Sequence, residues 1–382
     1  MRLLTITHYP ALLGANRSLL HLLAALRAQY GVEVLVFCPQ HGPFTEALEK
    51  QGIPFVVRPF ANWAYTIRSK ALYTVLWQWS RSKKAILPEL TDIARQFNPD
   101  IIHSNSSVVA LGWQLAETLQ KPHVWHLREF GWPDYQVIYP FGKKYVREKL
   151  AAANAIICIS DAIRQAWTQG LPCPTTVIYN GIGTKAAIQK NAAAGNTPNH
   201  DGLFRFLIIG QLQASKGQHE AIAAFAAVYR QHHTARLIVA GSGQRLYTLR
   251  LKAMARLLGL SKAVTFTGYV PNPAPLYAEA HVVLMCSQHE GMGRVTAEAM
   301  SYAKPVIGFA GGATPELIRH GENGFLYQTR AELSTLMVQS MENPALAAAI
   351  GQKGFETALE KFTDEGYGEG VWGVLEEFSK KN

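Results

Sequence analysis

Short apolar segments alternate with segments of helical period along nearly the whole chain, and this alternation restricts the fold more than any other feature. In the first half, helical stretches such as Arg17–Tyr30, Phe44–Gln51 and Leu87–Phe97 separate apolar segments rich in β-branched residues. Continuous apolar strands separated by helices are typical of a parallel sheet covered on both faces. Residues 1–183 are therefore predicted to form one doubly wound α/β domain. Its expected strands are Leu3–Thr7, Val32–Cys38, Ile53–Arg58, Ile101–His103, His123–His126 and Ala155–Ile159.

A second series of the same kind follows residues 184–202, a polar, turn-rich stretch without a period that is expected to connect two domains. Residues 203–362 are predicted to form the second α/β domain, since 382 residues suit two domains better than one core. Ligands of such sheets bind outside the carboxyl ends of the strands, so two facing domains would enclose a cleft. The expected strands are Phe204–Ile209, Ala235–Ala240, Val264–Thr267, Val282–Cys286, Pro305–Phe309 and Gly324–Tyr327, with helices at Gln218–Gln231, Ser242–Leu258 and Val295–Ser301.

The last residues, 363–382, carry a net charge of −3. The apolar residues of Val371–Phe378 fit one face of a helix. We expect this segment to be a terminal helix that packs on the basic first domain.

The formal net charge of +10 is divided almost evenly, with +7 in residues 1–183 and +6 in residues 184–362. This balance favours anionic partners such as nucleotides, anionic lipid surfaces or nucleic acid. An apolar fraction of 48% excludes a disordered chain, and no apolar run is long enough to span a membrane. The four cysteines form no CxxC pair, so a cytoplasmic protein with unpaired thiols is expected.

The most informative stretch runs from Cys286 to Pro305, where an apolar strand, a glycine-containing turn and a helix follow one another. The glycines allow the backbone to approach a ligand, and the first turn of a helix favours a phosphate. Glu290 precedes the turn, and Glu298 lies about 8 Å along the helix from Gly293 at 1.5 Å per residue. The two carboxylates could bracket an anion, with sugar hydroxyls at one end and ribose hydroxyls at the other. Two surface glutamates on an ordinary crossover are the simpler alternative.

Glu290 and Glu298 form an E-x7-E pattern within EGMGRVTAEAMSYAKPVIG, which resembles the donor-site signature of family 4 of the retaining glycosyltransferases. Further segments resemble that family in the same order along nearly the whole chain. They are Leu13-Gly-Ala-Asn-Arg-Ser, Trp125-His-Leu-Arg-Glu-Phe, Val177-Ile-Tyr-Asn-Gly-Ile, Gly210-Gln-Leu-Gln-Ala-Ser-Lys-Gly, Gly311-Gly-Ala-Thr-Pro-Glu and Gly321-Glu-Asn-Gly-Phe-Leu. The resemblance implies the GT-B fold, in which two Rossmann-like domains with doubly wound parallel sheets face each other.

The resemblance also implies a role for individual residues. Lys216 would neutralise the leaving diphosphate, Glu290 would bind sugar hydroxyls, and His126 would be the active-site histidine; these three form the expected catalytic set. Gln211 stands where the family has an arginine, which removes one positive charge from the site, and Arg294 is a candidate to supply it. The implied donor-binding residues are Gly14, Ala15, Gln211, Lys216, Val270, Glu290, Gly291, Met292, Gly293, Arg294, Val295 and Glu298.

No metal and no cofactor are expected. The six aspartates include no DxD pair, and His289-Glu290 is not part of an HExxH motif. Ala240-Gly-Ser-Gly243 is a weak phosphate-loop signal because Leu246 replaces the third glycine, which argues against a nicotinamide site. The co-substrate implied by the resemblance is a nucleotide diphosphate sugar with UDP or GDP as the nucleotide.

Two basic segments of the first domain, residues 66–87 and 141–150, contain aromatic residues among their lysines and arginines. Such segments can lie in a lipid interface, and a packed helix with a solvated basic end is an equal alternative. Because the family binds its acceptor on this domain, the resemblance implies a glycan or a lipid-linked acceptor. The protein could thus sit peripherally at the inner face of a membrane.

The function expected from the resemblance is retaining sugar transfer, without a metal, in surface polysaccharide or glycolipid biosynthesis. A nucleotide-sugar epimerase of the same fold is a second possibility, although no acid/base set for C–H abstraction is evident. A non-catalytic nucleotide-sugar or glycan-binding protein is a third, prompted by Gln211. Nucleic-acid binding is the least favoured, since no recognised module accompanies the charge.

Overall fold

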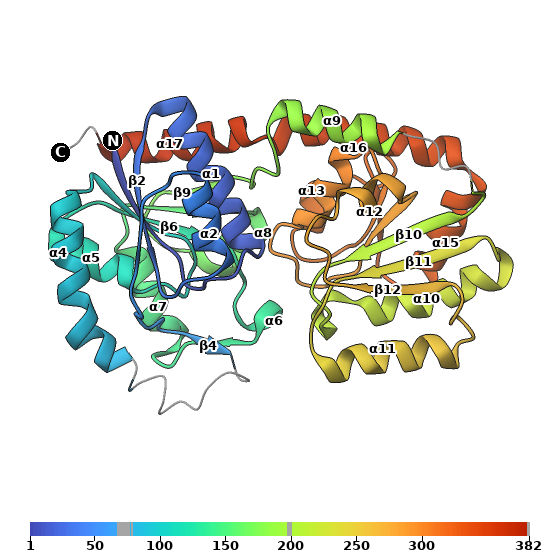
Figure 1. The fold of residues 1–382 in the computed structure, drawn as a ribbon, viewed down its shortest axis with the longest axis horizontal. Coiled ribbons are helices and arrows are strands. Elements are labelled where there is room, and N and C mark those ends of the chain that lie inside the picture. Colours follow the sequence, from blue (N-terminus) through green and yellow to red (C-terminus); the bar gives the residue numbers. More distant parts are fainter. Residues whose placement is uncertain (67–76, 78, 197–200, 380–382) are drawn as a thin grey trace. The chain divides into compact units, whose positions relative to one another are not determined.

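The computed structural model describes residues 1–66, 77, 79–196 and 201–379 and divides the chain into two compact units (Figure 1). Unit 1 comprises Met1–Gly181 and Asp364–Asn382, and unit 2 comprises Ile182–Thr363. Each unit contains its own sheet and core. Within the described ranges, no helix is long and apolar enough to cross a membrane.

The sheet of unit 1 has seven parallel strands in the order β3-β2-β1-β5-β6-β8-β9. This confirms the predicted doubly wound parallel architecture. A short antiparallel pair, β4 (Tyr65–Thr66) and β7 (Val137–Ile138), lies outside this sheet and was not predicted. The strands of the large sheet are β1 (Arg2–Ile6), β2 (Glu33–Cys38), β3 (Phe55–Val57), β5 (Ile101–Ser104), β6 (His123–Leu127), β8 (Ala155–Cys158) and β9 (Thr175–Val177).

Successive strand residues point to opposite faces of this sheet, and both faces are apolar. Helices therefore cover both faces. Leu3 and Ile101 face a core formed with α1, α2 and α17, whereas the adjacent Leu4 and Ile102 face α4 and α5. A π-helical turn at Ser82–Ile86 precedes α4. The helices of unit 1 are α1 (Gly14–Tyr30), α2 (Pro43–Lys50), α4 (Leu87–Phe97), α5 (Leu111–Leu119), α6 (Trp132–Tyr135), α7 (Gly142–Ala151), α8 (Asp161–Thr168) and α17 (Asp364–Ser379).

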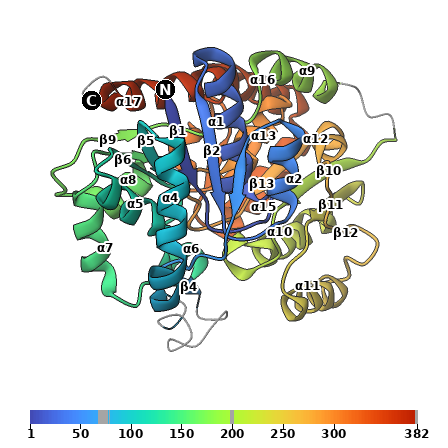
Figure 2. The same ribbon diagram turned by 60° about the vertical axis from the view of Figure 1, so that its left-hand side comes forward.

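Helix α17 lies alongside α1, although the two are separated by most of the chain (Figures 1 and 2). Gly368 permits the close approach, because a Cβ there would lie 2.9 Å from the Cβ of Ala25. The rings of Tyr30 and Trp372 stack with centroids 4.6 Å apart. At the start of α17, Asp364 pairs with His21 at 2.7 Å. The segment is therefore an integral layer of unit 1.

The sheet of unit 2 has six parallel strands in the order β12-β11-β10-β13-β14-β15. Its core packs β10, β11 and β13 against α10, α11 and α15. The strands are β10 (Phe204–Ile209), β11 (Ala235–Ala240), β12 (Val264–Gly268), β13 (Val282–Met285), β14 (Val306–Phe309) and β15 (Phe325–Tyr327). The helices are α9 (Lys185–Gly195), α10 (Gln218–Gln231), α11 (Arg245–Leu257), α12 (Ala274–Glu279), α13 (Arg294–Ser301), α14 (Thr314–Leu317), α15 (Arg330–Glu342) and α16 (Pro344–Lys361), with a 3-10 turn at Ala214–Lys216.

Residues 184–202 were predicted to be an irregular connection, but most of them are helical in the structure. Residues Lys185–Gly195 form helix α9, and the Thr184 side chain caps its first turn by accepting a hydrogen bond from the Ala187 backbone N–H. The helix packs against α12, α13 and α16. Gly195 is in close contact with the Tyr302 backbone, where a larger residue would clash. Most of the expected connection therefore belongs to unit 2.

Candidate active site

The carboxyl edge of the unit 2 sheet gathers the loops that follow β10, β11, β12, β13 and β14, because all these strands are parallel. Most of the predicted donor residues lie in these loops or in the helix after β13. Two of the loops are joined directly, since the Ser287 hydroxyl donates a hydrogen bond to the Ser215 carbonyl at 3.2 Å. The structure thereby brings the segment containing Lys216 beside the segment containing Glu290.

Gly217 makes this contact between the two loops possible. Its φ of +71° lies in the left-handed region, and it links the 3-10 turn to helix α10. A Cβ at this position would overlap the Cys286 carbonyl oxygen and lie 2.7 Å from the Cys286 Cβ. Glycine is thus required here by both conformation and space.

Lys216 and Glu290 form an ion pair, with Nζ 2.7 Å from Oε2. Their side chains are 21% and 15% exposed, so the pair is accessible but largely sheltered from solvent. The loop after β14 contacts the backbone of Glu290. The Ala313 N–H donates to the Glu290 carbonyl at 2.9 Å, and a Cβ on Gly312 would lie 2.6 Å from the Glu290 nitrogen.

Helix α13 begins immediately after Gly293, whose φ is +87°, and no side chain caps its N-terminus. The positive end of the helix, with its first-turn backbone N–H groups, therefore lies next to the Lys216–Glu290 pair. Gly291 and Val295 are half-buried, whereas Met292 is buried. A cation, a carboxylate and the N-terminus of a helix are thus gathered at one edge of the sheet.

Glu298 lies one turn further along α13 and is held by two neighbours. Arg294 Nε donates to Glu298 Oε1 at 2.8 Å, and the Tyr277 hydroxyl donates to Oε2 at 2.8 Å. Burial, together with the Glu298 charge, raises the pKa of Tyr277 well above its ordinary value, so the phenol remains a donor. Glu298 is thereby fixed in one orientation.

Gln211 is exposed in the loop after β10, and its backbone carbonyl accepts a hydrogen bond from Gln218 Nε2 at 3.0 Å. Arg294, the suggested source of the missing charge, is engaged with Glu298. Val270 lies in the loop after β12, two strands from β10. It shares the carboxyl edge with Lys216, but no described contact joins it to the ion pair.

Close packing requires the two glycines of the Ala240-Gly-Ser-Gly243 loop. A Cβ on Gly241 would overlap the Gly210 carbonyl oxygen, and one on Gly243 would overlap that of Leu212. The Leu212 N–H donates to the Ser242 carbonyl at 2.9 Å. The loops after β10 and β11 are therefore joined backbone to backbone.

In unit 1, His126 lies in β6 with no exposed surface. Its Nδ1 is 3.4 Å from an Arg128 guanidinium nitrogen and 3.3 Å from His103 Nε2. Because arginine can only donate, Nδ1 must accept, and the hydrogen-bond pattern assigns the proton of a neutral imidazole to Nε2. Burial and the Arg128 charge hold the pKa of His126 well below its ordinary value. Among the described residues, Nε2 has no hydrogen-bond partner.

Arg128 is the centre of this buried network and was not predicted as a site residue. Nε donates to Asn105 Oδ1 at 2.6 Å, and NH1 donates to Asn180 Oδ1 at 2.5 Å. NH2 donates to the Tyr367 hydroxyl at 2.9 Å, which brings in helix α17. The guanidinium thus links β6, the loops after β5 and β9, and α17, and holds His126 in one tautomer.

Glu129, next to this network, is also buried. It accepts hydrogen bonds from the Ser106 hydroxyl at 2.8 Å, the Ser107 N–H at 2.8 Å and the Ser107 hydroxyl. Burial is the main cause of its raised pKa, which these hydrogen bonds counteract. Gly14 and Ala15 open helix α1 near this edge of the sheet; Gly14 is exposed, and a Cβ there would meet nothing within 4 Å. A close-approach role for Gly14 therefore has no steric support within unit 1.

The basic cluster at 141–150 is largely engaged in unit 1. Lys143 donates to the Ala166 carbonyl at 3.3 Å, and Arg147 donates to the Trp167 carbonyl at 2.5 Å, so both satisfy the C-terminal end of α8. Lys149 lies 4.2 Å from the centroid of a Trp113 ring. The other basic segment, 66–87, falls partly outside the described residues, since 67–76 and 78 are not among them.

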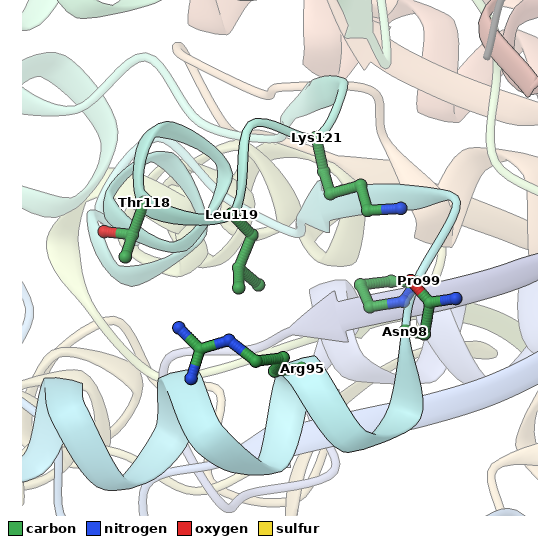
Figure 3. A pocket seen from close by; sticks show the side chains of 6 residues that line it. All are labelled: Arg95, Asn98, Pro99, Thr118, Leu119 and Lys121. Carbon is green, nitrogen blue, oxygen red and sulfur yellow. The ribbon is translucent and has the colours of Figure 1, made fainter.

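Two shallow cavities lie in unit 1, away from the residues described above. The first, with a volume of about 250 Å³, lies between the C-terminal ends of α4 and α5 (Figure 3). Pro99 and Lys121 on its wall precede β5 and β6, which places it at the amino edge of the sheet. The second is lined by residues of α8 and the start of β9, also at that edge. No group of three side chains suited to a metal occurs in the described part of the chain.

Each half of the chain matches a family model of glycosyltransferases. Residues 190–357 match the family model Glycosyl transferases group 1, and residues 13–186 match Glycosyltransferase Family 4. The alpha-monoglucosyldiacylglycerol synthase of Streptococcus pneumoniae is 25% identical over 386 aligned positions, covering 94% of this chain and 82% of that protein. Shorter matches also occur: EpsD of Bacillus subtilis is 32% identical over 151 residues, which span only 39% of either chain.

Solved structures share the fold over the full length. The Anabaena protein Alr3699/HepE, solved in complex with UDP, matches with a TM-score of 0.80 at 23% identity, covering 99% of this chain and 100% of that one. A sucrose-phosphate synthase from Thermosynechococcus elongatus matches with a TM-score of 0.78 at 19% identity, covering all of both chains. The agreement extends over both units.

Proposed function

Both halves of the chain belong to glycosyltransferase families of the GT-B type, and on this premise we propose that the protein transfers a sugar from a nucleotide diphosphate sugar to an acceptor hydroxyl with retention of configuration. The observation that carries the proposal is the Lys216–Glu290 ion pair beside the uncapped N-terminus of α13. An anionic sugar donor offers phosphates for the cation and the N–H groups, and hydroxyls for the carboxylate.

We assign the roles by chemistry. Lys216 has three donors, so it can bind a phosphate oxygen while Glu290 accepts from sugar hydroxyls. Glu298, fixed by Arg294 and Tyr277, would accept from the ribose hydroxyls. The backbone of residues 291–295 would hold phosphate and sugar, with Gly14, Ala15, Gln211 and Val270 as outlying donor contacts.

Departure of the nucleoside diphosphate would be assisted by Lys216 and the first turn of α13, both of which stabilise developing negative charge. We infer that no metal is needed, because the chain has no DxD pair. We assign none of the described side chains the role of a nucleophile and favour front-face displacement, in which the leaving phosphate accepts the acceptor's proton. The neutral His126 would donate from Nε2 to a sugar oxygen.

A UDP-sugar is the first donor to test, since HepE structures contain UDP, UDP with glucose, or UDP-glucose. A GDP-sugar is the alternative. For the acceptor we propose a glycan or a lipid-linked glycan bound by unit 1. Relatives named alpha-monoglucosyldiacylglycerol synthase and lipopolysaccharide core biosynthesis glycosyltransferase LpsE support a role in glycolipid or polysaccharide synthesis. We propose that the protein acts at the cytoplasmic side of a membrane.

Donor binding and transfer can be tested separately. Thermal unfolding with UDP-, GDP- and ADP-sugars should reveal the donor, since ligand at 100 times its Kd stabilises by about 2.7 kcal/mol. Release of the nucleoside diphosphate is then followed with glycan and glycolipid acceptors. Glu290→Ala should abolish transfer while the protein remains folded, and Glu322→Gln, at an exposed glutamate, should not. Full turnover by Glu290→Ala would refute its assigned role.

A non-catalytic nucleotide-sugar-binding protein is a second candidate. It is favoured by one observation: Gln211 supplies no charge, and Arg294 is occupied by Glu298. Donor binding without hydrolysis or transfer across the acceptor panel would support it. A nucleotide-sugar epimerase would instead change the donor's stereochemistry without an acceptor, which NMR of the incubated donor would detect.

A further inference from the structure

Helix α11 of unit 2 has apolar residues on its outer face. Leu246, Leu249 and Leu257 are 82%, 54% and 87% exposed, respectively, and Ala253 is exposed as well. At 100° per residue these positions fall on one stripe of the helix. The opposite side is the packed one, with Leu251 and Ala255 buried in the core. Large exposed leucines that share one stripe are uncommon on a surface without a partner.

The stripe is bordered by positive charge. Arg250 lies on one flank, and Arg245, Lys252 and Arg256 lie on the other by helical position. No acidic residue occurs anywhere in residues 221–278, a stretch that contains seven lysines and arginines. No carboxylate within that stretch of sequence therefore neutralises the helix. Both views place α11 at the outside of its unit, beside α10 and the edge strand β12 (Figures 1 and 2).

We propose that α11 is an interfacial helix that docks unit 2 on an anionic lipid surface. The leucine stripe would enter the boundary between headgroups and acyl chains, and the flanking cations would contact lipid phosphates. The positive charge of this face distinguishes between a second copy of the protein and an anionic bilayer as its partner. A second copy of this face would bring the same cations against one another, whereas an anionic bilayer complements them and also accepts the leucines.

This surface differs from the two segments of unit 1 considered from sequence alone, 66–87 and 141–150. In 141–150, Lys143, Arg147 and Lys149 already have partners within unit 1. On α11, Lys252 Nζ lies 5.8 Å from the centroid of the Phe266 ring, and the exposed leucines add an apolar component to the remaining positive charge. The inference concerns binding only and does not depend on which sugar, if any, is transferred.

The test is cosedimentation of the full chain with vesicles of phosphatidylcholine alone and of phosphatidylcholine mixed equally with phosphatidylglycerol. We expect binding to the mixed vesicles that weakens with salt as charges are screened. Leu246→Gln combined with Leu257→Gln should weaken binding at least tenfold, since each leucine contributes buried apolar area. Arg250→Gln combined with Arg256→Gln should weaken it at low salt by a similar factor.

Matched controls are Leu346→Gln, at an exposed leucine of α16, and Arg319→Gln, at an exposed arginine; both should bind like the parent protein. The altered side chains are exposed, so the variants should fold, which circular dichroism would check. The proposal fails if mixed vesicles do not bind the protein or if the α11 variants bind them unchanged. It also fails if the leucine variants instead convert a dimer to a monomer in gel filtration, because α11 would then be a self-association face.

Discussion

Replacing Tyr367 by phenylalanine tests whether the C-terminal helix supports the buried network of unit 1. The substitution removes one hydroxyl and leaves the ring in place. That hydroxyl accepts a hydrogen bond from Arg128 at 2.9 Å, and both side chains are buried. The Arg128 guanidinium would thus lose one hydrogen-bond acceptor at a place where water has little access.

The structure sets the size of the effect. Hydrogen bonds to charged groups contribute about 1.5–3 kcal/mol, and an unsatisfied buried partner forfeits this amount. For a domain the size of unit 1, each kcal/mol shifts Tm by about 2–4 °C, so we expect a decrease of about 3–12 °C. The orientation of Arg128 would also loosen, and with it the hydrogen bond that fixes the His126 tautomer.

Tryptophan fluorescence is the appropriate assay because all eight tryptophans lie in unit 1 and none in unit 2. The thermal transition it records therefore belongs to the unit under test. Tyr30→Phe is the matched control, since it removes a hydroxyl from the same helix pair but not from the network; its Tm should change little. Nitrogen-15 NMR of labelled histidines would report the tautomer independently. Equal Tm values for Tyr367→Phe and Tyr30→Phe would refute the reasoning.

Three further predictions concern the donor loops and the histidines. Glu290→Gln should lower kcat/KM about 10–100-fold with little change in stability, since the ion pair is partly solvated; steady-state transfer and unfolding assays would separate the two. Gly217→Ala should destabilise unit 2 by more than about 2 kcal/mol in urea unfolding, because strain and overlap combine, whereas Gly259→Ala, with a similar φ but open space, should cost about 1 kcal/mol. Equal costs at the two glycines would contradict the overlap. Below pH 6.5 the unfolded chain should bind protons at His8, His103, His123 and His126, whose pKa values burial lowers in the folded state. The raised pKa values of Glu129 and Asp134 oppose this only in part, so the free energy of unfolding of unit 1 should fall by about 2 kcal/mol per pH unit between pH 6 and 5. Stability that is flat or rises on acidification would contradict this sign for the four histidines.

The sheets were predictable because their strands are buried on both faces and therefore appear as uninterrupted apolar runs. Edge elements were harder to predict: two of the three residues of β9 (Thr175–Val177) are threonines, and the antiparallel pair β4–β7 has only two residues in each strand. Helix α9 was missed because its composition suggested a loop. Its five alanines and the Thr184 N-cap were the signals that could have identified it.

The candidate donor site could be predicted from a local pattern, since Glu290 and Glu298 belong to one strand–turn–helix segment. Lys216 is distant in sequence, but its loop follows a neighbouring parallel strand, which topology brings to the same edge. The hydrogen bond between Arg128 and Tyr367 could not be inferred in this way. It joins residues 239 positions apart, and no periodicity or motif relates a tyrosine on a terminal helix to an arginine beyond a strand.

The packing of α17 onto α1 also has a consequence for the order in which the protein folds during synthesis. Unit 1 is discontinuous, because the 182 residues Ile182–Thr363 of unit 2 are translated between its two parts. At about 5–20 residues per second, this gap amounts to roughly 10–40 s. Throughout that interval Arg128 lacks Tyr367 and one face of α1 lacks its cover. The nascent first unit is then most exposed to aggregation and most dependent on chaperones, and the arrival of α17 ends that period.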